Sequence, residues 1–206
     1  MIAIVDYGMG NLRSVQKGFE KAGFPAIITS SPSDLSRAQK LVFPGVGAFG
    51  AAMKELKKRR LISPIKKGIK EGKPFLGLCL GLQLLFEESE EAKGIKGLGI
   101  LPGKVLRFRF PKDKNLKIPH MGWNRIDCVP AKRDCPLLAG IPAGAFMYFV
   151  HSYYVSPEEK DVILTATEYG IKFTSGIWKG NLYATQFHPE KSQDTGLSIL
   201  KNFGRL

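Results

Sequence analysis

The sequence is poor in the residues that build disulfide frameworks and metal sites. Its 206 residues include only three cysteines and three histidines. The cysteines are odd in number and none has the C-x-x-C spacing, which argues against a disulfide scaffold and against a zinc–thiolate site. We therefore expect a reducing compartment. Of the three, Cys128 and Cys135 carry no motif and are interpreted as structural, which leaves Cys79.

Long hydrophobic runs are missing as well. The longest nearly apolar run, residues 74–86, is too short to span a bilayer. The N-terminal MIAIVDYG has no basic segment and carries Asp6 inside its first apolar stretch, unlike a signal peptide. These features predict a soluble, cytoplasmic protein.

Acidic residues are scarce relative to basic ones, which gives a formal net charge of +13 and suggests an anionic partner. The excess is spread evenly, with 16 basic against 9 acidic residues in 1–103 and 15 against 9 in 104–206. The basic clusters 54–60 and 66–73 have little aromatic interleaving, so we interpret them as solvated helix faces. A nucleic-acid-binding module stays open as an alternative, although no motif supports it.

The first half of the chain alternates strand-like and helix-like segments. Apolar runs at 2–8, 24–31, 41–47 and 74–81 are separated by helical patterns at 11–23 and 48–72, the second interrupted at Pro64. Such alternation predicts a parallel sheet covered on both faces. Three of the runs end in glycine, and loops at the carboxyl ends of parallel strands are where such sheets bind ligands.

The second half has a different texture. Short strand-like runs at 104–110, 145–155, 161–170, 172–180 and 181–190 follow one another with turn-like breaks, one of them the hairpin pair Gly180-Asn181. These predict mostly antiparallel strands, closed by a helix at about 195–203. We therefore expect one α/β domain over 1–206, an open and mostly parallel sheet with an antiparallel extension.

Cys79 lies between Gly77 and Gly81 in the stretch PFLGLCLGLQLLFEES, residues 74–89. If 74–78 is a strand and 80–89 a helix, Cys79 occupies the sharp turn of a nucleophile elbow. The N-terminus of the helix would favour the thiolate, and the N–H of Leu80 would be available to an oxyanion. The competing interpretation is a buried core thiol with two incidental glycines.

A cysteine nucleophile needs a base, and the base needs an orienting group. His188 stands two residues before Glu190 in QFHPEK. Residues i and i+2 of a strand point to the same side, so Glu190 can reach one ring nitrogen of His188 while the other faces Cys79. Neither of the other two histidines has a carboxylate so placed.

Together, GLCLGLQLL and QFHPEK resemble the nucleophile and His-Pro-Glu motifs of class I glutamine amidotransferases. DYGMGNLRSV, PGVGAFG and PHMGWN extend the resemblance along nearly the whole chain, toward the glutaminase subunits of imidazole glycerol phosphate synthase. The resemblance implies a three-layer αβα fold. It also implies hydrolysis of glutamine to glutamate and ammonia, without metal or organic cofactor. The ammonia would pass to a (β/α)₈-barrel cyclase subunit of histidine biosynthesis.

The resemblance assigns further roles to individual residues. It implies an oxyanion donor at Val46 beside that of Leu80, and a partner-facing loop at PHMGWN. Seen alone, Gln83 would be a helix-surface glutamine, Trp123 a core aromatic and His120 a structural histidine. The residues implied to hold glutamine are Gly47, Gln83, Glu91, Ser152 and Tyr153, and those implied to face the cyclase are Asn11, Trp123 and Lys191.

Two alternative enzymes remain beside the binding module. A paralogous class I amidotransferase would keep the same chemistry and supply ammonia to a different synthetase. A cysteine peptidase or esterase would use the same elbow on other substrates. Activity on glutamine and the identity of the partner distinguish them.

Overall fold

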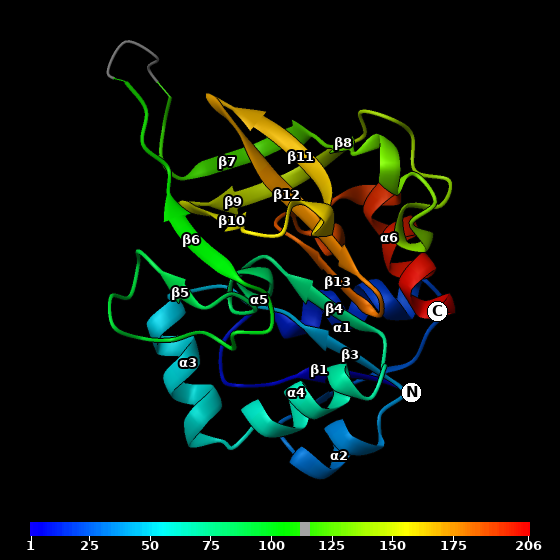
Figure 1. The fold of residues 1–206 in the computed structure, drawn as a ribbon. Helices are drawn as coiled ribbons and strands as arrows, with labels where there is room; N and C mark the ends of the chain where they lie inside the picture. The colour runs from blue at the N-terminus through cyan, green and yellow to red at the C-terminus, as the bar shows by residue number, and fades with distance from the viewer. Residues whose placement is uncertain (112–115) are drawn as a thin grey trace.

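The computed structural model describes residues 1–111 and 116–206. Eleven strands of these residues join in one sheet with the order β2-β1-β3-β4-β13-β12-β10-β6-β5 (Figure 1). Off this path, β11 pairs with β12, and β8 pairs with β11. The five strands from β2 to β13 are mutually parallel. They are β2 (Ala26–Thr29), β1 (Ile2–Val5), β3 (Lys40–Phe43), β4 (Phe75–Leu78) and β13 (Leu182–Thr185).

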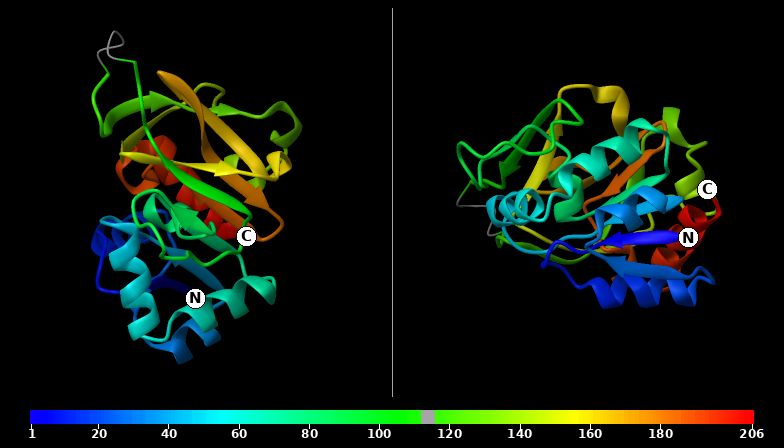
Figure 2. Two further views of the ribbon diagram at one scale, coloured as in Figure 1. Left: turned by 60° about the vertical axis from the view of Figure 1, so that its left-hand side comes forward. Right: turned by 90° about the horizontal axis from the view of Figure 1, so that it is seen from below.

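Helices cover both faces of the parallel strands, as alternate residues of those strands show. Ile2 and Ile4 pack into a core with α1 and α6. Ala3 and Val5 pack into a second core with α2, α3 and α4. Figure 2 shows these helical layers from two further directions. The helices are α1 (Leu12–Lys21), α2 (Pro32–Arg37), α3 (Phe49–Lys58), α4 (Ile62–Lys70), the short α5 (Leu80–Gln83) and α6 (Gln193–Arg205).

The antiparallel extension begins at β13, which pairs antiparallel with the long strand β12. From there β10 and β6 continue the sheet in antiparallel pairs. This arrangement confirms the predicted α/β fold with a mostly parallel sheet and an antiparallel part. The remaining strands are β5 (Glu88–Ser89), β6 (Gly103–Arg107), β8 (Asp127–Cys128), β10 (Tyr153–Pro157), β11 (Ile163–Tyr169) and β12 (Ile171–Lys179).

A separate two-stranded ribbon is formed by β7 (His120–Arg125) and β9 (Phe146–His151). The predicted single run 145–155 therefore divides at Ser152 into β9 and β10, which belong to different sheets. The PHMGWN segment, expected as a loop, is mostly strand β7. The strand was not recognised in the sequence because its apolar side chains point to solvent: Met121 and Trp123 are 62% and 46% exposed.

The predicted helix over 48–72 is interrupted, but at residues 59–61 rather than at Pro64. Arg60 has a positive φ of 58°, which ends α3, and Pro64 sits in the first turn of α4. A proline there removes an N–H that has no helical partner anyway. Helix α2 was not predicted.

The expected helix 80–89 is wrong beyond its first turn, because α5 ends at Gln83. The carbonyls of Leu84, Leu85 and Phe86 instead accept hydrogen bonds from the backbone N–H groups of residues 98–101, at 2.8–3.2 Å. A single turn has only a small dipole, so the dipole contribution to a thiolate at Cys79 is weaker than a long helix would give. No helix in the described ranges is long and apolar enough to cross a membrane.

Candidate active site

Cys79 occupies a strained turn between β4 and α5. Its φ and ψ are 52° and −105°, a conformation that non-glycine residues rarely adopt. Backbone strain of this kind is concentrated at functional sites. The turn is held by the Cys79 N–H, which donates to the Thr185 carbonyl at 2.7 Å, and by the Cys79 carbonyl, which accepts from Leu82 at 3.0 Å. This geometry is that of a nucleophile elbow, and it argues against an ordinary core thiol.

The two flanking glycines are required by close backbone approach. A Cβ on Gly81 would lie 1.8 Å from the Phe43 carbonyl oxygen on β3, and one on Gly77 would lie 3.0 Å from the Gly81 carbonyl oxygen. No side chain fits at Gly81 unless the backbone moves. The glycines therefore allow α5 to pack directly on the ends of β3 and β4, which brings Cys79 to the edge of the sheet.

His188 and Glu190 form a buried pair. His188 Nδ1 lies 2.8 Å from Glu190 Oε1, and each side chain is 3% exposed. His188 follows the end of β13 and precedes the 3₁₀ turn η5 (Pro189–Lys191), which contains Glu190. The two residues are therefore not on one strand, as had been expected. The predicted neighbour is still reached, because His188 is extended and the turn folds Glu190 back onto it.

The electrostatics link this pair to Cys79. Burial alone would lower the pKa of His188, but the neighbouring Cys79 and the hydrogen-bonded Glu190 outweigh it and raise that pKa to about 10. The imidazole of His188 is therefore cationic at neutral pH. His188 Nε2 is buried and has no hydrogen-bond partner among the residues described. The proton on Nε2 can therefore be delivered to a leaving group.

A cavity of about 380 Å³ opens beside Cys79. This volume suits a small polar ligand. Three residues that the sequence did not single out, Pro119, Val150 and His151, also line it. The structure brings all the expected glutamine and oxyanion positions to this cavity: Val46, Gly47, Leu80, Gln83, Glu91, Ser152 and Tyr153.

Two of the lining side chains are already oriented by backbone groups. Glu91 Oε2 accepts the N–H of Phe49 at 2.7 Å, and Gln83 Nε2 donates to the Tyr153 carbonyl at 3.1 Å. Gln83 is only 5% exposed, so its interpretation as a helix-surface glutamine is wrong. The other oxygen of Glu91 and the amide oxygen of Gln83 accept no hydrogen bond from any residue in the described ranges.

One expected oxyanion donor is engaged in this structure. The N–H of Leu80 donates to the Gly45 carbonyl oxygen at 3.3 Å, so it is not free for a ligand. The segment that carries Gly45 is itself anchored, because the hydroxyl of buried Tyr7 donates to the Pro44 carbonyl at 2.9 Å. Burial and the nearby Cys79 raise the pKa of Tyr7, which keeps that hydroxyl protonated.

Comparison with known proteins agrees with this geometry. The family model described as "Glutamine amidotransferase class-I" matches residues 3–205. The chain belongs to the class I glutamine amidotransferase family. Two solved structures with the same fold are a glutamine amidotransferase (19% identity, TM-score 0.74, 99% of this chain and 100% of that one) and PurLQS from Thermotoga maritima (16%, 0.75, 98% and 96%).

Two similar curated relatives of this amidotransferase are both named "Imidazole glycerol phosphate synthase subunit HisH". The protein from Syntrophotalea carbinolica is 54% identical over 99% of each chain. That from Aquifex aeolicus is 52% identical over 98% of this chain and 95% of its own. The similarity thus extends over essentially the full length.

The residues expected to face a partner are partly gathered on one surface of this amidotransferase. Trp123 lies edge-on to Tyr148 with ring centroids 6.1 Å apart, and Lys191 Nζ lies 5.9 Å from the centre of the same Tyr148 ring. Trp123 is therefore exposed rather than a core aromatic, whereas His120 is buried and stacks on Tyr169 at 4.0 Å as a structural histidine does. Asn11 caps α1 by accepting the Ser14 N–H at 3.3 Å and has no hydrogen bond or ring contact with this group.

Sequence reasoning missed Gln186 and Ser192. Gln186 Nε2 lies 3.5 Å from Cys79 Sγ, and the Ser192 hydroxyl donates to the His188 carbonyl at 2.6 Å. The spacing contained a signal for Gln186, since it precedes His188 by two residues in QFHPE. Ser192 had no such signal, because its role depends on the η5 turn.

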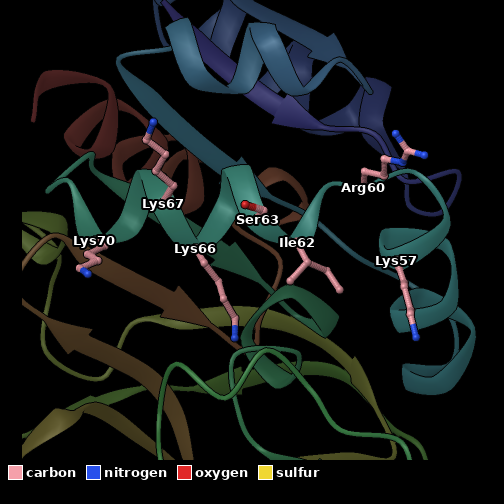
Figure 3. Close-up of a pocket in the computed structure, with 7 residues that line it drawn as sticks. All are labelled: Lys57, Arg60, Ile62, Ser63, Lys66, Lys67 and Lys70. Atoms are coloured by element: carbon pink, nitrogen blue, oxygen red, sulfur yellow. The ribbon is translucent and has the colours of Figure 1, made fainter.

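A second hollow, of about 590 Å³, lies away from these groups between α3 and α4 (Figure 3). Lys57, Arg60, Lys66, Lys67 and Lys70 line it, but Figure 3 shows their charged ends pointing in different directions rather than toward one point. It contains none of the expected site residues. Within residues 1–111 and 116–206, no group of three or more metal-ligating side chains is gathered.

Proposed function

We propose that this amidotransferase hydrolyses glutamine through a thioester on Cys79, as the glutaminase subunit of an imidazole glycerol phosphate synthase. The observation that carries the proposal is the strained Cys79 elbow beside the buried His188–Glu190 pair, at a cavity lined by every expected glutamine-binding position. Full-length similarity to proteins named as that subunit supports the choice among amidotransferases. In this proposal residues 1–206 act as one domain.

The proposed reaction starts from a Cys79 thiolate and the cationic imidazole of His188. The Cys79 thiolate attacks the side-chain amide carbon of glutamine, and the His188 imidazolium protonates the departing ammonia. Neutral His188 then takes a proton from water, which attacks the thioester and releases glutamate. Glu190 keeps the imidazole oriented and stabilises its cationic form.

Both steps pass through a tetrahedral oxyanion. The backbone N–H groups of Leu80 and Val46 are the donors in this proposal. Leu80 must first exchange its bond to the Gly45 carbonyl for the oxyanion, so the 44–47 segment has to move during turnover.

Charge and hydrogen-bonding capacity favour an amino acid in the cavity. The unpartnered oxygen of Glu91 suits the α-ammonium of glutamine, and the Gln83 amide oxygen suits a second donor. Backbone groups of Gly47, Ser152 and Tyr153 complete the lining. A peptide or ester substrate would not need the half-buried carboxylate of Glu91.

The partner in this proposal is a (β/α)₈-barrel cyclase that receives the ammonia. The exposed Trp123 and the Lys191–Tyr148 pair form an apolar and cationic surface of the kind that anchors protein interfaces, with Asn11 as a further contact. We place the complex in the cytoplasm, where free cysteines such as the three found here stay reduced.

The test is to combine the chain with a cyclase subunit and to measure glutamate production with and without the cyclase ligand. Ligand-dependent hydrolysis of glutamine in the complex supports the proposal. Hydrolysis that responds only to another synthetase would support the paralogous alternative. Turnover of peptides or esters, with none of glutamine, would overturn the proposed activity.

A further inference from the structure

We propose that Gln186 is a further catalytic residue, whose side-chain amide donates a hydrogen bond to the sulfur of Cys79 and stabilises the thiolate. Gln186 Nε2 lies 3.5 Å from Cys79 Sγ. Gln186 is fully buried, so bulk water cannot replace this donor. The inference rests on the proposed function only in taking Cys79 as the nucleophile.

The orientation of the Gln186 amide follows from its neighbours. The Tyr153 carbonyl can only accept, so the Gln83 atom 3.1 Å from it is the nitrogen. That nitrogen lies 3.2 Å from Gln186, whose nearer atom is therefore the amide oxygen. The other end of the Gln186 amide, the NH₂ group, then faces the sulfur. Two amides in series thus fix a donor, rather than an acceptor, against Cys79.

The end of this series of hydrogen bonds that lies away from Cys79 is fixed as well. The Tyr153 carbonyl also accepts from His151 Nδ1 at 2.8 Å, which leaves His151 Nε2 as an acceptor for His120 Nδ1 at 2.9 Å. Burial lowers the pKa of His151 to about 3 and that of His120 to about 4, so both rings are neutral and each keeps one tautomer. The carbonyl that orients Gln83 is therefore held by a buried and uncharged pair.

The Cys79 thiolate needs such a donor because its other surroundings stabilise the negative charge only weakly. The Val150 carbonyl oxygen lies 3.9 Å from Cys79 Sγ, and a carbonyl favours the thiol over the thiolate. Helix α5 is a single turn, so its dipole is small. Among the residues described, Gln186 and His188 are the side chains that favour the charged sulfur.

The test measures the pH dependence of alkylation at Cys79 in the full chain, with iodoacetamide as the probe. Quantifying the Cys79 peptide by mass spectrometry separates it from Cys128 and Cys135. Gln186→Met keeps the side-chain length and removes the donor. Because a hydrogen bond to a charged group is worth about 1.5–3 kcal/mol, the alkylation midpoint should rise by about one to two pH units. Gln186→Glu should raise it further, since a carboxylate repels the thiolate.

Ser175→Ala is the matched control. Ser175 is equally buried and neighbours Gln186 through the backbone bond from the Gln186 N–H to the Ser175 carbonyl. Its hydroxyl bonds to Thr165 and not to the sulfur, so its loss should leave the midpoint unchanged. An equal shift in Ser175→Ala would reduce the effect to general loosening of the core and overturn the inference.

Gln83→Met supplies a second route if Gln186→Met does not fold. Without Gln83 the Gln186 amide is free to turn, so a smaller upward shift is expected. The double variant Gln83→Met/Gln186→Met should match Gln186→Met alone, because Gln83 acts through Gln186. A folded Gln186 variant, or a folded Gln83→Met, whose midpoint stays within a few tenths of a unit of the parent would refute the role.

Glutamine hydrolysis distinguishes this inference from the proposed function. In the active complex, Gln186→Met should lower kcat at neutral pH, and the deficit should narrow toward pH 9 as the thiolate forms without assistance. A shifted alkylation midpoint in a chain that never hydrolyses glutamine would leave the hydrogen bond established and the proposed function wrong. Glutamine hydrolysis with an unshifted midpoint would overturn the role of Gln186 alone.

Discussion

Replacing Glu190 by glutamine separates orientation of the imidazole from proton transfer. The change keeps the side-chain shape and leaves an amide oxygen able to accept from His188 Nδ1 at the present 2.8 Å. What is lost is the negative charge, in a pair whose side chains are only 3% exposed. The expected loss is about 1–1.5 kcal/mol, the difference between a hydrogen bond to a charged partner and one to a neutral partner.

That energy sets both the rate and the pH profile. If the charge acts in full on the transition state, glutamine hydrolysis falls about 5- to 13-fold. The pKa of His188, raised to about 10 in the parent, must fall, because an opposite charge that favoured the imidazolium has gone. The alkaline limb of kcat/KM therefore moves to lower pH, by about one unit.

The assay is glutamate release by the chain in complex with its cyclase, from pH 6 to 10, with thermal melting to check folding. His188→Ala is the reference, because no other group is placed to move the proton, and it should nearly abolish turnover. Glu159→Gln is the matched control, since Glu159 forms only an exposed ion pair with Lys179 and should behave as the parent. A folded Glu190→Gln as inactive as His188→Ala, or with an unmoved alkaline limb, would refute the assignment.

Three further predictions concern the nucleophile, the elbow and the partner surface. Cys79→Ser changes one atom, so synthesis from glutamine should collapse in the assembled complex while added ammonium salt restores product; retained glutamine-dependent synthesis would revive the core-thiol interpretation. Gly81→Ala places a Cβ 1.8 Å from a backbone oxygen and should lower the free energy of unfolding by at least about 1–3 kcal/mol in denaturant titrations. Gly180→Ala should cost less, because its Cβ meets nothing within 4 Å and only the positive φ of 59° is strained. Trp123→Ala and Lys191→Ala should weaken binding of the cyclase, measured by titration calorimetry, or its activation of glutamine hydrolysis, without lowering the melting temperature. Unchanged binding together with unchanged activation would remove both residues from the interface.

The sequence predicted the parallel half of the fold because each strand there is buried on both faces. Residues 2–5 and 74–81 are apolar throughout, and the glycines that follow or end these runs mark the sheet edge where ligands bind. β7 escaped prediction because its outward residues, Met121 and Trp123, are apolar while its inward residues include His120 and Asn124. Its pattern is the reverse of the usual one, so hydrophobicity alone gives no strand signal.

The candidate site was predictable where chemistry depends on residue type and short spacing. Cys79 between glycines, and Glu190 two residues after His188, are local patterns. Gln186 depends on a contact made across the fold, to a sulfur 107 residues away, and the two residues meet only once β13 lies beside β4. Ser192 depends on the conformation of the η5 turn, which brings its hydroxyl to the His188 carbonyl.

The conformation of the 44–47 segment could not be predicted at all, and it divides the site into two parts. Cys79, His188 and Glu190 are held by buried hydrogen bonds in one arrangement, whereas the Leu80 N–H is occupied by the carbonyl of a glycine. Glycine adopts alternative backbone conformations at little cost, so the peptide after Gly45 can turn while the triad stays in place. Tyr7 holds this segment at the Pro44 carbonyl, just before Gly45. The Leu80 N–H can therefore become free for an oxyanion through a change in the backbone of residues 45–47 while the cysteine and its base stay in place.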